Sequence, residues 1–244
     1  MKNLRSVRAM NGYTVRASDG NIGRVRELYF DDAKWLIKYI VVDINRLRPG
    51  RKVLLPSSVV DQVKWERREI WISATTAEVR NSPNIATDKP VALQRIAEKK
   101  GRRNWAMYLA GEAVTAVPEI LDAPGFTAVN KNGKPFDPHL RTTRIVTGLT
   151  LRASDGAAGH IVDFIVDDES WAIRYLVVEL GDRRQVLLFP GLVKEIRIDE
   201  DAVTIDLPAR MVADCPTLDP STLLTRRYEE SVAGHYQVSG YWSS

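Results

Sequence analysis

Three observations predict a mainly β protein, made of two tandem small antiparallel β-barrels with short helical appendages. The segment 12–44 returns as 148–180 at a constant offset of 136 positions, with 15 identities in 33 aligned pairs. Apolar and polar residues alternate within each copy, which is typical of strands. Turn residues separate these predicted strands at short intervals. Together these features favour two copies of one small β-domain.

The composition is typical of a soluble globular protein. The chain has 244 residues, of which 44% are apolar and 27% charged, enough for two domains of ordinary size. It contains no apolar run of the length that a membrane-spanning helix needs, and its first residues do not resemble a secretory signal. The single Cys215 cannot form an internal disulfide. We therefore expect a cytoplasmic protein.

The repeat continues beyond its most similar part and sets the expected domain boundaries. After residue 52 the offset falls to 133, so that 59–72 aligns with 192–205. The expected division has four parts, which are a first barrel at 1–85, a helical segment and linker at 86–138, a second barrel at 139–218, and a helical tail at 219–244.

Turn chemistry marks the strands of each copy. Ser-Asp-Gly at 18–20 and 154–156 is typical of a hairpin turn between the first two strands. The acidic pairs 31–32 and 167–168 bend the chain before the next strand. The stretch after the last strand of each copy predicts a short helix that ends before a proline. A further helix is expected over 88–111, followed by an irregular linker over 112–138.

The net charge of +4 hides a gradient along the chain. Residues 1–85 carry 16 Lys or Arg and 9 Asp or Glu, a net charge of +7. Residues 139–218 carry 9 and 13, a net charge of −4. The basic repeat could attract nucleic acid or an anionic membrane surface, or it could face an acidic repeat in the same chain or in a symmetry mate. We favour the second alternative, because the positive charges do not form a run.

The repeated pattern resembles a known family. The pattern is G-x-x-(V/L)-R-A-S-D-G-x-x-G, an acidic pair, and W-x-I-(K/R)-Y-(I/L)-V-V-(D/E). It resembles the PRC-barrel family, named for the cytoplasmic domain of the photosynthetic reaction centre H subunit, and most closely the stand-alone bacterial proteins with two such barrels. The resemblance implies the barrel fold and no particular reaction. It extends to closing residues in the tail, namely Tyr228, Glu229, Tyr236, Tyr241 and Trp242. The N-terminal membrane helix of the H subunit has no counterpart here, which argues against a reaction-centre role.

Aromatic residues form the first candidate site, a surface for a partner. Trp35 and Tyr39 recur as Trp171 and Tyr175, four positions apart, and would share one strand face. They either pack the barrel and its helical cover or anchor a partner. Two further tryptophans occur only in the first copy. They are Trp65 and Trp71, where the second copy has Ile198 and Thr204.

A basic loop is the second candidate site. Arg46, Arg48, Arg51 and Lys52 lie in a loop three residues longer than its counterpart in the second copy. Such a loop beside a small barrel could contact the phosphate groups of RNA, or it could simply be solvated.

The remaining polar residues favour structural roles. Paired acids such as Asp31 and Asp32 suit hard cations, but no further oxygen ligands follow at calcium-site spacing. The histidines at 139, 160 and 235 are scattered, and neither they nor Cys215 have a predicted catalytic companion. We therefore expect no catalytic residue, metal or cofactor.

The expected function is that of a non-catalytic protein-interaction or assembly module with a protein partner or a homo-oligomeric state. One alternative is binding of RNA or ribonucleoprotein by the basic first barrel. Another, by family analogy alone, is an accessory role at a membrane photosynthetic or electron-transfer complex, by peripheral association with the membrane.

Overall fold

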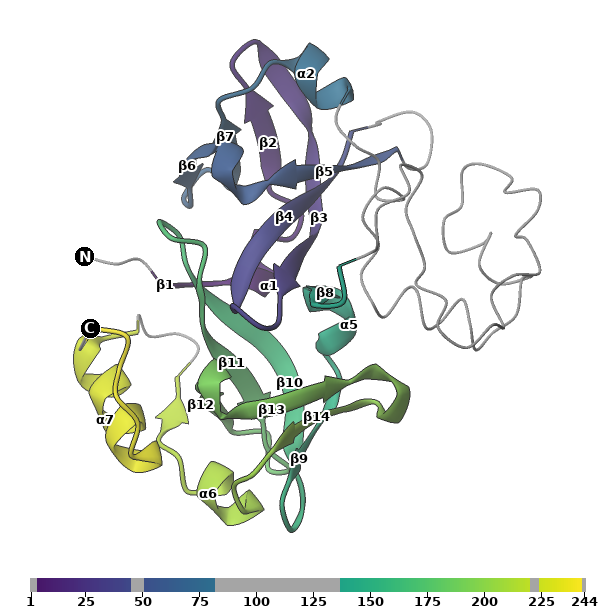
Figure 1. Ribbon diagram of the computed structural model, residues 1–244. Helices are drawn as coiled ribbons and strands as arrows, with labels where there is room; N and C mark the ends of the chain where they lie inside the picture. The colour runs from purple at the N-terminus through teal and green to yellow at the C-terminus, as the bar shows by residue number, and fades with distance from the viewer. Residues whose placement is uncertain (1–3, 45–50, 82–136, 220–223, 243–244) are drawn as a thin grey trace, which may run out of the picture. The chain divides into compact units, whose positions relative to one another are not determined.

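The computed structural model describes most of both repeats (Figure 1). The described residues are 4–44, 51–81, 137–219 and 224–242. The helix expected over 88–111 lies outside them, and so does the linker expected over 112–138 except for its last two residues. Within the described residues, no helix is long and apolar enough to cross a bilayer.

The chain forms two compact units. The first unit comprises Met10–Thr142 and holds most of the first repeat. The second unit comprises Met1–Ala9 with Thr143–Ser244 and holds most of the second repeat. These units differ from the expected barrels at 1–85 and 139–218, because each one takes a short strand from the other repeat. Both are mainly β, as expected.

The first unit holds a 7-stranded sheet with the order β5-β4-β3-β2-β7-β6, and β8 added beside β3. Its neighbours pair antiparallel except β2 and β7, which run parallel. The strands are β2 (Thr14–Ala17), β3 (Gly20–Asp31), β4 (Leu36–Asp43), β5 (Lys52–Pro56), β6 (Val60–Lys64), β7 (Glu69–Ile72) and β8 (Leu140–Thr142).

The second unit repeats this arrangement in an 8-stranded sheet with the order β13-β14-β9-β10-β11-β12-β15, and β1 beside β10. Here β9 and β14 form the parallel pair. The strands are β1 (Leu4–Ser6), β9 (Thr150–Ala153), β10 (Gly156–Asp167), β11 (Ile173–Glu179), β12 (Gln185–Leu188), β13 (Val193–Arg197), β14 (Ala202–Ile205) and β15 (Thr217–Leu218).

Neither sheet closes on itself, so the prediction of closed barrels is wrong. No ladder among the described residues joins the two ends of either strand order. Pro56 ends β5, and the 3-10 turn η1 (Ser57–Val59) redirects the chain before β6. In the second unit, η3 (Pro190–Leu192) begins with a proline between β12 and β13. A proline lacks the N–H that a ladder needs. At each of these two turns the chain leaves one strand and enters the next without a ladder between them, so β5 does not pair with β6 and β12 does not pair with β13.

Short helices flank the sheets. In each unit the predicted helix after the last repeat strand is present, as α2 (Thr76–Arg80) and α6 (Ala209–Ala213). The predicted tail helix is α7 (Arg226–Tyr236), and η4 (Ile198–Glu200) is a 3-10 turn between β13 and β14. Two helical turns follow the added strands, namely α1 (Val7–Met10) and α5 (Thr143–Val146).

A glycine present in both copies marks the point where two strands come closest. Gly23 lies at a register shift in β3, and a side chain there would come within 2.0 Å of the carbonyl oxygen of Asp43. Its counterpart Gly159 would meet the carbonyl oxygen of Glu179 at 2.4 Å. Only glycine allows this approach, which lets the long strand bend and pair with both neighbours.

The expected aromatic row is wrong at its first member. Trp35 and Trp171 lie in the turns before β4 and β11, with φ of 53° and 60°, and not in the strands. This left-handed conformation is rare for a bulky residue. The turn carboxylate Asp31 stabilises it in the first unit by accepting two backbone N–H groups at 2.9 Å. The spacing of four therefore does not place Trp35 on the strand face of Tyr39.

Candidate functional site

A cationic and aromatic surface lies on the outward face of β2, β7 and β6 in the first unit. Along β7 the side chains of Ile70 and Ile72 are buried, so Glu69 and Trp71 lie on the other face. Arg16 of β2 pairs in register with Trp71, and Lys64 of β6 pairs with Glu69. The sheet thus brings residues from three strands into one patch, and Figure 1 shows these strands side by side.

The centre of this surface is Trp71 with cations beside it. The Nζ atom of Lys64 lies 4.0 Å from the centroid of the Trp71 ring, and Cζ of Arg16 lies 5.5 Å from it. Glu69 fixes the arrangement, because it accepts the indole N–H at 3.0 Å and pairs with the Nε of Arg16 at 3.1 Å. Both distances to the ring are within the range of a cation–π interaction.

The turn between β6 and β7 carries further aromatic and basic side chains. Trp65 packs edge-on against Tyr13, with ring centroids 5.8 Å apart, and Arg68 lies 5.4 Å from the Tyr13 ring. Trp71 and Trp65 are half-buried, whereas Arg67 and Arg68 are exposed. We call the set Arg16, Lys64, Trp65, Arg67, Arg68 and Trp71 the hairpin surface. It offers aromatic faces framed by positive charge.

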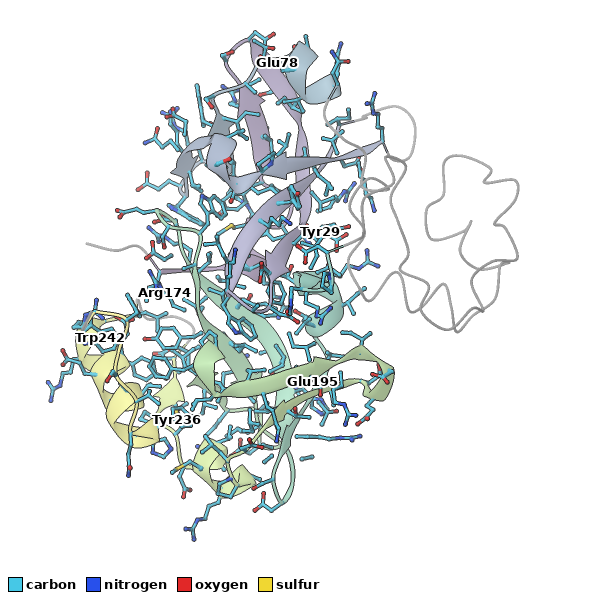
Figure 2. The ribbon with its side chains drawn as sticks, viewed as in Figure 1. Tyr29, Glu78, Arg174, Glu195, Tyr236 and Trp242 are labelled. Atoms are coloured by element: carbon cyan, nitrogen blue, oxygen red, sulfur yellow. The ribbon has the colours of Figure 1, made fainter. Side chains whose placement is uncertain are left out.

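The second unit carries the opposite charge at the equivalent place. At the offset of 133, Arg67 and Arg68 become Glu200 and Asp201, and Trp71 becomes Thr204. The other cations there are neutralised, since Arg152 and Arg197 each pair with Glu200, at 3.2 Å and 2.8 Å. Figure 2 shows Glu195, which replaces Gln62, on the same hairpin. The hairpins differ in charge and aromatic content on an equivalent framework.

The basic loop is only partly described. Arg46 and Arg48 lie outside the described residues. Arg51 is exposed, and Lys52 is half-buried at the start of β5. Because β5 and β6 lie at opposite ends of the strand order, the sheet does not pair this loop with the hairpin surface. The structure therefore does not bring the two candidate sites of the first repeat onto neighbouring strands.

The predicted aromatic pairs have different surroundings in the two units. Trp35 and Tyr39 are half-buried in the first unit, and Trp35 stacks on Phe30 at 5.6 Å between centroids. In the second unit Trp171 is 6% exposed and Tyr175 is fully buried. The two rings of the second repeat therefore offer no partner surface in this structure, because they form part of the core.

A buried carboxylate explains why Tyr175 is enclosed. Glu229 on α7 is 3% exposed and accepts hydrogen bonds from the hydroxyls of Tyr175 at 2.9 Å and Tyr241 at 2.8 Å. Arg226 pairs with its other oxygen at 3.1 Å. Burial, together with Glu229, raises the pKa of Tyr241 to about 12 and raises the pKa of Tyr175 further. These neutral hydroxyls satisfy the carboxylate and fix the tail on the sheet.

The tail also borders a shallow hollow. Its volume is about 320 Å³, and it is lined mainly by apolar groups with one cation, Arg174. Figure 2 shows Arg174, Tyr236 and Trp242 around α7. The guanidinium of Arg174 pairs with Asp167 at 3.0 Å and lies 4.2 Å from the Tyr241 ring. The guanidinium of Arg174 therefore already has an anionic and an aromatic partner within its own unit.

The remaining candidate acids have structural roles. Asp167, like Asp31, accepts backbone N–H groups of its own turn, from Glu169 and Ser170. Asp19 accepts the N–H and hydroxyl of Thr76 at 2.7 Å and 2.9 Å, and so binds the start of α2. Asp155 does the same for α6 through the N–H of Ala209. The Asp of the repeated Ser-Asp-Gly thus attaches a helix to the hairpin.

The histidines and the cysteine are dispersed. His160 is exposed on β10, His139 lies 2.9 Å from a carboxylate oxygen of Asp32, and His235 lies 2.7 Å from the carbonyl of Met211. Burial raises the pKa of the Cys215 thiol, which favours the unreactive form. Among the described residues, no three His, Cys, Asp or Glu side chains converge as a metal site would require.

Comparison with known proteins identifies one domain. Residues 3–79 match the family model of the PRC-barrel domain, so the chain contains a PRC-barrel domain in its first repeat. The match extends from β1 to α2 and includes the whole hairpin surface. No curated protein matches the chain.

Proposed function

We propose that this protein is a non-catalytic interaction module that captures an acidic protein partner through the hairpin surface of its first unit. The observation that supports this proposal is the difference between two equivalent hairpins. The turn residues Arg67 and Arg68 are replaced by acids in the second repeat, and both tryptophans are lost there. If these residues served only to build the sheet, the second repeat would need them too.

The residue types suit this role. Tryptophan and arginine are enriched at the energetic centres of protein interfaces. Trp71 is positioned by Glu69 and by cations at 4.0 Å and 5.5 Å, so little side-chain freedom remains to be lost on binding. The exposed Arg67 and Arg68 would steer and orient an acidic segment.

We also propose that residues 139–218 are a second PRC-barrel domain. The support is the strand register. In the first unit Thr14 pairs with Arg24, and in the second Thr150 pairs with His160, both shifted by 136 positions. In this proposal the second domain supplies the same scaffold with a different surface.

Affinity purification with a repeat-swapped variant tests the main proposal. The variant gives the first hairpin the residues of the second, by Trp65→Ile, Arg67→Glu, Arg68→Asp and Trp71→Thr. A control, Lys34→Glu with Arg80→Asp, makes the same change in net charge at other exposed positions of the first unit. Proteins held by both the wild type and the control should be missing from the swapped variant. Equal capture by all three would contradict the proposal.

RNA binding through the same surface is the second candidate. A half-buried tryptophan beside lysine and arginine side chains is also the arrangement on which single-stranded bases stack. Retention of single-stranded RNA at low salt, lost in the swapped variant and weakened steeply by added salt, would favour this candidate. Capture that survives ribonuclease treatment would favour the protein partner.

A further inference from the structure

The first strand of each repeat lies in the sheet of the other repeat. β1 begins the first repeat but pairs with β10, where Ser6 is opposite Ile165. β8 begins the second repeat but pairs with β3, where Thr142 is opposite Tyr29. The exchange is reciprocal, because Ser6 and Thr142 are 136 positions apart and so are their partners Tyr29 and Ile165. The PRC-barrel match begins at residue 3, so by sequence β1 belongs to the first repeat.

The exchanged strands make equivalent polar contacts in their host sheets. The Nε of Arg5 lies 3.7 Å from Asp168, and the Nε of Arg141 lies 2.6 Å from Asp32. One position later, a hydroxyl donates to a half-buried carboxylate. These pairs are Ser6 with Asp163 and Thr142 with Glu27. All four contacts are related by the same offset.

Burial attaches β8 to its host sheet, whereas hydrogen bonds attach the half-buried β1. Leu140 is fully buried and Thr142 is 1% exposed; Leu140 packs in the core cluster of the first unit with Tyr29, Val41 and Leu54. In the second unit, the Asp163 carboxylate accepts the backbone N–H of Arg8 at 2.9 Å in addition to the Ser6 hydroxyl. Withdrawal of either strand would remove the hydroxyl donor from Asp163 or from Glu27, and withdrawal of β8 would also expose the apolar surface that Leu140 covers.

We infer that each unit has a strand-binding groove that recognises Leu-Arg-(Ser/Thr), and that this reciprocal exchange holds the two halves of the chain together without their covalent connection. The groove of the second unit lies beside β10, and its acids Asp163 and Asp168 contact the bound strand. The groove of the first unit lies beside β3, and its acids Glu27 and Asp32 do the same. The partner for each groove is the leading strand of the other repeat. Recognition combines backbone pairing with one ion pair and one hydroxyl contact.

A cut chain with engineered cysteines tests this inference. A protease site is inserted between Gly125 and Phe126 of the full-length Cys215→Ser protein. Leu4 and Asp167 are paired in the exchanged arrangement, so Leu4→Cys with Asp167→Cys should join the two halves by a disulfide. Leu4→Cys with Asp31→Cys is the matched control, because Asp31 is the equivalent position in the sheet of the same repeat.

The readout is a non-reducing gel after cleavage. The inference expects the Leu4–Asp167 variant to run as one joined species and the Leu4–Asp31 variant as two halves. The reverse result, with a disulfide inside the first half and free halves for the other variant, would overturn it.

A second measurement needs no cysteine. After cleavage, the wild-type halves should co-elute in size exclusion under native conditions. Arg5→Ala with Arg141→Ala should weaken their association at least about tenfold, since each substitution removes the guanidinium that pairs with an aspartate of the host sheet. Arg80→Ala with Arg210→Ala removes one exposed arginine from α2 and one from α6, away from both exchanged strands, and should leave the association unchanged. Wild-type halves that separate on cleavage, or equal effects of the two double variants, would overturn the inference.

Discussion

The two units share one scaffold but differ in which face is covered and which is charged. In the second unit, α7 covers Tyr175 and the hairpin is acidic. In the first unit, Tyr39 is half-buried and the hairpin carries tryptophans and cations. The Ser-Asp-Gly turns, the acidic pairs and the glycine at 23 and 159 are the same in both. Positions that shape the sheet are therefore alike in the two units, whereas several outward positions differ.

The largest expected effect separates the two equivalent tyrosines. Tyr175→Ala should lower the free energy of unfolding by about 3–5 kcal/mol, because it leaves a cavity in a closed core. Tyr39→Ala should cost about 1–2 kcal/mol, because that ring is only half-buried. Urea unfolding, with amide hydrogen exchange to assign the loss to one unit, measures both. Equal losses would mean that the two faces are equally enclosed.

The next effect concerns the buried carboxylate that fixes the tail. Glu229→Gln keeps an acceptor for the two tyrosine hydroxyls but removes the ion pair with Arg226, and should destabilise the second unit by about 1–3 kcal/mol. The neighbouring Glu230→Gln is the control, since that side chain is exposed. Both are measured by urea unfolding. A similar stability for the two variants would show that the ion pair adds nothing to tail docking.

A single substitution makes the two hairpins alike at their central position. Trp71→Thr should lower stability by only about 1 kcal/mol, because the ring is half-buried, yet weaken partner capture at least about tenfold. Thermal unfolding and quantitative pull-down give the two values. A stability loss several times larger with capture unchanged would assign Trp71 to the fold and not to binding.

The smallest effect depends on pH. Hydrogen bonds from Thr76 hold the pKa of the Asp19 carboxyl below its ordinary value of 3.8. A lowered pKa means that Asp19 adds stability above that ordinary value and that the contribution is lost as the pH falls through the folded-state pKa. Asp19→Asn should therefore cost a little stability at pH 7 and nothing at the acid end. Denaturant midpoints across the acid range check this, and a pH-independent difference would contradict it.

Local pattern predicted much of the scaffold. The Ser-Asp-Gly hairpins, the turns at the acidic pairs and the short helices before Pro83 and Pro216 follow from residues close in sequence. Sequence reasoning failed at Trp35, because a bulky residue with positive φ is stabilised by turn hydrogen bonds that periodicity does not encode. It also failed on closure, because no described ladder joins β5 to β6, the two ends of the first sheet, or β13 to β15, the two ends of the second.

The candidate site was predicted in part. Trp65 and Trp71 stood out because the second copy lacks them, and the structure places Trp71 beside Arg16 of β2, a strand far from it in sequence. Arg67 and Arg68 were missed, although the aligned repeats show their replacement by acids. The role of Glu229 could not be predicted, because its partner Tyr175 is 54 positions away and meets it only through packing of the tail.

The sequence alone determined that one residue pattern occurs twice and where its two occurrences differ in charge and aromatic content. The tertiary structure decided which sheet receives each leading strand. Both repeats begin with Leu-Arg followed by a hydroxyl residue, and both sheets present acids at the receiving positions. Each leading strand therefore has a matching sequence for the sheet of either repeat. Only the path of the chain in three dimensions distinguishes a strand that joins the other repeat's sheet from one that returns to the sheet of its own repeat.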